Sequence, residues 1–134
     1  MTTGIIRDTL REAISDYVFV NRPDAAFYDS ISERVDPAPP LWVTASFFPT
    51  DSESMLCGQQ LHQGTCEINV YGEGGISDAD VIALADELGA YFNEPPQLSN
   101  GVSITRVAQP AEATSGDGVA WYGVVVAVDY LAKL

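Results

Sequence analysis

The fold is decided by Val119-Ala120-Trp121-Tyr122-Gly123-Val124-Val125-Val126-Ala127-Val128, a stretch near the C-terminus that is apolar at nearly every position. A β-strand of this composition needs cover on both of its faces. Two helices can cover one face of a small sheet, so the other face meets either the irregular segment 21–40 or another copy of the chain. Burial inside its own domain and contact with a second subunit are both open for this strand. In the second case the subunit interface would use Trp121, Tyr122, Val124 and Val126, with the two aromatic residues as anchors.

Two amphipathic helices are expected to supply the cover. The first runs from about Thr3 to Tyr17, and the second begins after the capping residue Ser77 and stops at Asn93-Glu94-Pro95-Pro96. Apolar residues recur at helical spacing in both segments: Ile6, Leu10, Ala13, Ile14 and Tyr17 in the first, and Val81, Leu84, Ala85, Leu88 and Phe92 in the second. Stripes of this kind pack on a core.

Four or five strands complete the predicted fold. They are Leu41–Phe48, a weaker candidate from Met55 to Leu61, Thr65–Tyr71, Val102–Ala108 and the terminal strand from Val119 to about Tyr130. Turn-forming residues fill 49–54 and 109–118, which are expected to be polar loops. The predicted class is α/β (α+β), with a mixed, mostly antiparallel sheet of four to five strands and two helices packed on one face. Residues 1–134 are expected to form a single domain.

Charge is the strongest feature of the composition. The chain of 134 residues has 19 Asp and Glu against 6 Lys and Arg, a formal net charge of −13. This charge repels nucleic acid phosphates and anionic membranes, so neither is an expected specific target. Besides a solvated surface, it suits a protein that mimics DNA or one that lines a passage through which DNA slides. The sequence shows no membrane-spanning run and no secretion signal, so synthesis in a cytoplasm is expected.

Catalytic and ligand-binding motifs are scarce. His62 is the only histidine, and no signature of a nucleophile surrounds it. The glycine-rich turn at residues 72–75 lies between a strand and a helix but does not match a phosphate-binding loop. Cys57 and Cys66 are expected to be small buried hydrophobes; a disulfide across a hairpin is the less favoured alternative, and a zinc site is less favoured still. We therefore expect no enzyme activity, no catalytic residue, no cofactor and no metal.

Several segments together resemble the tail terminator family of siphophages, the minor tail protein U-like proteins. The resemblance is carried by the opening amphipathic helix, by Cys66-Glu67-Ile68-Asn69-Val70-Tyr71 with the glycine-rich turn after it, and by the Leu84/Leu88/Phe92 helix. It continues in Val102-Ser103-Ile104-Thr105-Arg106-Val107 and in the terminal strand from Trp121 to Tyr130. The resemblance spans nearly the whole chain, as a pattern without an invariant catalytic motif.

The resemblance implies a structural protein of the virion, made in the host cytoplasm and located in the phage tail or neck. Members of the family form a hexameric ring on the end of the tail tube, terminate its polymerisation and provide the head-side joining surface. The implied partners are further copies of the chain, the tail tube protein and a head-tail connector or tail-completion protein, while DNA passes through without specific binding. The partner-facing positions in the predicted polar loops are Asp51, Glu53, Glu112 and Asp117.

Two other functions remain open. An acidic inhibitor that mimics DNA would expose carboxylates in rows toward a DNA-binding protein and need not form a ring. A neighbouring neck component, such as a tail-completion protein, could share a similar small α/β design.

Overall fold

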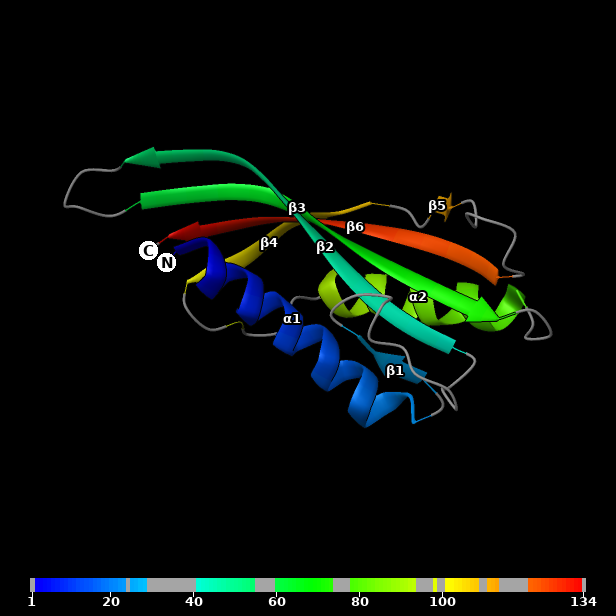
Figure 1. Cartoon of the computed structure of the whole chain (residues 1–134). Helices are drawn as coiled ribbons and strands as arrows, with labels where there is room; N and C mark the ends of the chain where they lie inside the picture. Colours follow the sequence, from blue (N-terminus) through cyan, green and yellow to red (C-terminus); the bar gives the residue numbers. More distant parts are fainter. Residues whose placement is uncertain are drawn as a thin grey trace.

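The computed structural model (Figure 1) describes residues 2–23, 25–28, 41–54, 60–73, 78–93, 98, 101–108, 111–113 and 121–133. Within these residues the chain forms α1 (Thr2–Asn21), β1 (Ala25–Phe27), β2 (Leu41–Ser54), β3 (Gln60–Glu73), α2 (Asp78–Asn93), β4 (Val102–Val107), β5 (Ala111–Ala113) and β6 (Trp121–Lys133).

The strands form one mixed sheet in the order β1-β2-β3-β6-β4. β1 pairs with β2 in parallel, and the other pairs along this order are antiparallel. The short β5 pairs with Gly123–Val125 of β6, on the same edge that β4 occupies along Val128–Ala132. The sheet is therefore five strands wide, and the predicted α+β class with a mostly antiparallel sheet is confirmed.

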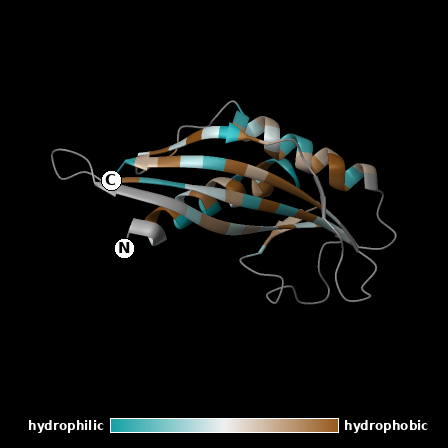
Figure 2. Cartoon of the chain, turned by 90° about the horizontal axis from the view of Figure 1, so that it is seen from above, coloured by the Kyte–Doolittle hydropathy of each residue, from teal (hydrophilic) through white to brown (hydrophobic). Residues whose placement is uncertain are grey.

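Both helices pack on one face of this sheet (Figure 1), α1 beside β1 and β2, and α2 across β6, β3 and β4. Side chains that point to the helices alternate with side chains that point away, and Figure 2 shows this alternation as bands of hydropathy along the strands. In β3 the buried set is Cys66, Ile68 and Val70, each at most 1% exposed. The helix residues buried against the strands are Ile6, Leu10, Ile14, Val18, Val81, Leu84, Ala85, Leu88 and Phe92.

Polar and aromatic contacts join the C-terminal end of α1 to α2. The Tyr17 hydroxyl donates to the Glu87 carboxylate at 3.3 Å, and Arg22, just after α1, forms an ion pair with the same carboxylate. The rings of Tyr17 and Tyr91 lie 4.7 Å apart. Burial, and then the negative charge of Glu87, raises the pKa of Tyr17, so its hydroxyl keeps the proton that it donates.

Several boundaries differ from the sequence-based expectation. α1 continues past Tyr17 to Asn21, and β2 continues to Ser54 through residues that were predicted to be a loop. This second half of β2 pairs with the start of β3 after a bulge between Pro49 and Asp51. The hairpin projects past the helices there (Figure 1). A strand that no helix covers does not require alternating apolar residues, so hydrophobic periodicity does not reveal it. Residues 55–59 of the weaker candidate strand lie outside the described residues.

Gly64 of β3 lies where three strands come close together. It is paired with Pro49 of β2 and with Tyr130 of β6. A Cβ atom at this position would overlap the Tyr130 hydroxyl and lie 2.7 Å from the carbonyl oxygen of Phe48. The Tyr130 ring can therefore lie over the strand only because residue 64 has no side chain.

Candidate interaction surface

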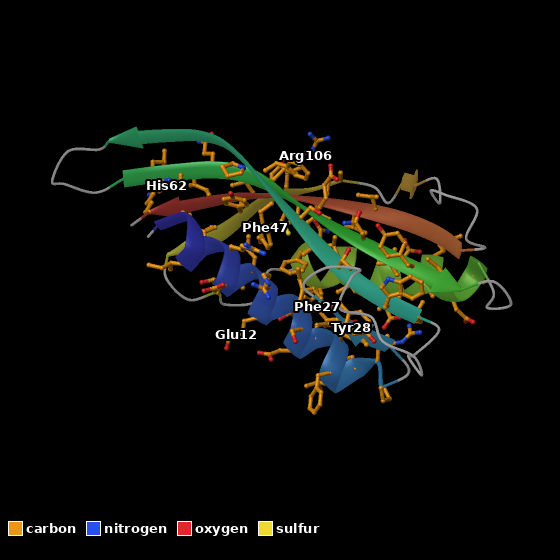
Figure 3. All side chains as sticks on the ribbon, viewed as in Figure 1. Glu12, Phe27, Tyr28, Phe47, His62 and Arg106 are labelled. Atoms are coloured by element: carbon orange, nitrogen blue, oxygen red, sulfur yellow. The ribbon has the colours of Figure 1, made fainter. Side chains whose placement is uncertain are left out.

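The face of the sheet opposite the helices, here called the open face, is the main candidate for a partner contact. Figure 3 shows its position: Arg106 lies above the sheet, whereas Phe47 lies between the sheet and α1. The strand registers place on this face the side chains that alternate with the core. They are Thr44, Ser46, Phe48, Thr65, Glu67, Asn69, Tyr71, Ser103, Arg106, Val125, Ala127, Asp129 and Leu131.

The open face is partly accessible in the single chain, and Trp42 and Thr44 on it are buried. Phe48 is 48% exposed, and the side chains that β3 and β6 contribute are half-buried. At one end Trp42 is buried, and its ring stacks on Tyr71 with centroids 5.5 Å apart. In the middle, Glu67 lies between the short side chains of Ser46 and Ala127. The open face thus carries aromatic residues and Arg106, which are types enriched at protein interfaces.

A hollow of about 370 Å³ opens on this face beside a bulge in β4 between Ile104 and Arg106. The Thr65 hydroxyl donates to the Asp129 carboxylate at 2.8 Å, and the Thr105 hydroxyl donates to the main-chain oxygen of Asp129 at 3.3 Å. These groups can hydrogen-bond a polar side chain of a partner, but the lining residues contain no paired nucleophile and base. The lining consists of Gln63, Gly64, Thr65, Thr105, Asp129, Tyr130 and Leu131.

Negative charge lies on the outer side of the helices. Glu12 points away from the sheet (Figure 3), and it is exposed together with Asp8 and Asp16 on α1 and with Asp80 and Asp86 on α2. Three of the described arginines lie close to a carboxylate or an aromatic ring. Arg11 lies 3.8 Å from Asp8, Arg22 pairs with Glu87, and the Arg7 guanidinium lies 5.9 Å from the centre of the Phe47 ring.

The predicted subunit interface needs one correction. Val124 and Val126 are 3% and 0% exposed and belong to the core under the helices, so they cannot contact another subunit while the domain is folded. The reason is the strand register, which turns even-numbered residues of β6 toward the helices and Val125 toward the open face. Trp121 and Tyr122 belong to β6 and are paired with Glu73 and Gly72, but their side chains lie outside the described part of the structure.

Three of the four predicted partner-facing residues lie in strands and not in the loops where they were expected. Asp51 and Glu53 lie in β2, paired with Gln63 and Leu61, and not in a loop. Glu112 lies in β5, opposite Val124 of β6. Asp117 lies outside the described residues. The sequence does not indicate β5, because a three-residue strand carries too little hydrophobic periodicity to be recognised.

The residues considered for chemistry are dispersed. His62 is half-buried in β3, opposite Ala132. Cys66 is the buried hydrophobe that was expected, and desolvation raises the pKa of its thiol to about 12, so it stays protonated at neutral pH. Cys57 lies outside the described residues. Within the described ranges no three His, Cys, Asp or Glu side chains could hold a metal ion together. No helix in the same ranges combines the length and apolar character needed to cross a membrane.

Neither a protein-family model nor a curated protein matches the sequence. Among solved structures, 21 chains match. One of them, a protein whose name states no function, aligns with 100% of this chain and 97% of its own, at a TM-score of 0.64 and 21% sequence identity. This likeness shows that the fold recurs as a whole, over nearly the same chain length.

Proposed function

We propose that this protein is a structural component of a phage tail, which forms a ring on the end of the tail tube, terminates its polymerisation and provides the head-side joining surface. The open face is the observation that carries the proposal. Helices cover one side of the sheet, while Phe48, Val125 and Leu131 stay partly exposed on the other. Polar residues such as Thr65, Asn69 and Asp129 lie between these three side chains, so the face mixes apolar and polar groups, as protein interfaces do. The resemblance to tail terminators supplies the kind of assembly, a repeated contact that closes into a ring.

The charge distribution supports a role beside DNA without binding to it. A protein that holds DNA places Lys and Arg against phosphates and releases counterions. Here the net charge is −13, and the outer side of α1 exposes Asp8, Glu12 and Asp16. A passage lined by such a surface lets DNA slide without sticking.

The row of carboxylates on α1 favours a second function, that of an acidic inhibitor mimicking DNA. Asp8, Glu12 and Asp16 follow each other at four-residue spacing, which puts successive carboxylates about 6 Å apart along the helix. Arg7 and Arg11 lie in the same helix, however, and Arg11 is 3.8 Å from Asp8. Basic groups within the row weaken its likeness to a line of phosphates, so we place this function second.

The growth of tail tubes distinguishes these functions. Purified protein is added to tail tube protein of the same phage during polymerisation, and tube lengths are measured by negative-stain electron microscopy against a sample without the protein. We expect shorter tubes, each with a ring at one end. A neighbouring neck component would leave tube length unchanged. Unchanged lengths together with displacement of DNA from a DNA-binding protein would support the mimic and contradict the terminator.

A further inference from the structure

β1 is a three-residue strand at the margin of the described sheet, beside the C-terminal end of α1 (Figure 1). It pairs in parallel with Leu41–Val43, the first three residues of β2. The side chains of β1 are only half-buried, whereas Leu41 and Val43 beside them are 0% exposed. A short parallel strand that buries little apolar surface is weakly held by its pairing alone.

Arg22 connects α1 to this strand through its backbone. Its N–H donates to the Val18 carbonyl at 2.9 Å, and its carbonyl accepts from the Ala25 N–H at 3.1 Å. After β1, the Tyr28 N–H donates to the Val43 carbonyl at 2.9 Å. The strand is therefore fixed at both ends, by the turn at Arg22 before it and by the bond from Tyr28 to β2 after it.

The Arg22 side chain is held in turn by Glu87 of α2. The two side chains form an ion pair in which the arginine is 17% and the glutamate 36% exposed. The other Glu87 oxygen accepts a hydrogen bond from the Tyr17 hydroxyl at 3.3 Å. An ion pair that is partly shielded from water, with one partner already held in place, is stronger than a fully exposed pair. Glu87 therefore ties the start of β1 to α2, whose apolar side is buried in the core.

We propose that the Glu87–Arg22 contact is a latch that keeps β1 on the edge of β2, and that β1 opens as a local unit when this contact breaks. In the closed state β1 covers the backbone edge of Leu41–Val43. Opening exposes the N–H and C=O groups of these residues, and an exposed edge is a place where another strand can pair. The latch thus controls access to the start of β2. This inference does not depend on the proposed ring.

The rest of the domain has its own support when β1 opens. The apolar stripe of α1 stays buried against the sheet, since its buried apolar residues between Ile6 and Val18 are at most 3% exposed. β2 keeps its antiparallel ladder with β3 along its whole length. Opening does remove the packing of Ala25 and Phe27 against the core, so the closed state is the dominant one.

Amide hydrogen exchange followed by NMR on the full chain tests this opening. The Tyr28 N–H reports on β1, because it bonds to Val43 only when the strand is paired. The Ile68 N–H, in the central strand β3, reports unfolding of the whole domain. In the wild type we expect Tyr28 to be protected about a hundredfold less than Ile68, with little effect of low urea concentrations on its exchange. Equal protection with equal urea dependence would mean that β1 opens only with the whole domain, and would overturn the proposal.

Glu87→Gln tests the latch itself. Loss of the carboxylate should speed exchange at Tyr28 about tenfold, because the Arg22 guanidinium loses a charged partner. Asp86→Asn is the matched control, since it removes the same charge from an exposed neighbouring position of α2. In this control Tyr28 should exchange as in the wild type. An unchanged rate in Glu87→Gln, or an equal acceleration in Asp86→Asn, would overturn the proposal.

Tyr17→Phe takes the place of Glu87→Gln if that variant does not unfold cooperatively. It keeps the aromatic ring beside Tyr91 and removes only the hydroxyl that donates to Glu87. Exchange at Tyr28 should then rise about threefold, because Glu87 keeps its charge but loses one of the groups that hold it. In that case an unchanged rate at Tyr28 would overturn the latch.

Discussion

Val126→Asp is expected to unfold the domain, whereas Val125→Asp, at the preceding position in β6, is expected to leave it folded. Val126 is 0% exposed beneath the helices, and an aspartate there would bury a carboxylate without a partner. That change destabilises a domain by about 4 kcal/mol or more, a large part of the roughly 5–15 kcal/mol that holds a typical domain together. Val125 lies half-buried on the open face, where a carboxylate keeps contact with water.

Urea unfolding followed by circular dichroism measures both variants. Val125→Asp provides the matched control, since the same substitution is made on the same strand and only the face of the sheet differs. The urea concentration at its unfolding midpoint should be close to that of the wild type. Its effect should instead be weaker self-association. Equal destabilisation of the two variants would show that Val125 is as inaccessible to water as Val126. The open face could then not be the interaction surface.

Gly64→Ala is expected to lower the free energy of unfolding by about 2–4 kcal/mol, a large effect for one added methyl group. The new Cβ would overlap the Tyr130 hydroxyl and lie 2.7 Å from the Phe48 carbonyl oxygen, and the second of these is backbone within the sheet. To remove this overlap, either the Tyr130 side chain must move or β2 and β3 must separate. Tyr130 is only 4% exposed, so its movement would disturb the core.

Gly89→Ala in α2 is the control for this prediction. The nearest atoms to a Cβ at Gly89 are methyl carbons of Val107 and Val126 at 3.8 Å, an ordinary contact distance. Alanine favours a helix over glycine by about 0.5–1 kcal/mol, so this variant should be as stable as the wild type or more stable. Comparable losses in the two variants would mean that the strands do not approach as closely at Gly64 as described.

The parts of the fold that could be predicted are those whose sequence pattern matches their burial. Leu84 and Leu88 recur at helical spacing because one side of α2 meets the sheet, and Cys66, Ile68 and Val70 alternate because one side of β3 does. β1 and the second half of β2 cannot be predicted from the sequence, for two different reasons. β1 has only three residues, and the outer half of β2 projects past the helices, where no apolar face is required.

The candidate surface was harder to derive than the fold. β6 is apolar on both sides, so its composition cannot tell Val126, which is buried in the core, from Val125 on the open face. Only the register with β3 separates them. Interface roles for Trp121 and Tyr122 remain predictions.

The mass of the protein in solution tests the ring most directly. Six chains of 14.4 kDa give a particle of about 86 kDa, which sedimentation equilibrium separates clearly from the monomer. Because each copy carries a charge of −13, its neighbours repel it, and salt screens that repulsion over about 8 Å at physiological ionic strength and about 3 Å at 1 M. We therefore predict a six-chain species whose share grows as salt rises from low values. A monomer at every protein and salt concentration would contradict the account.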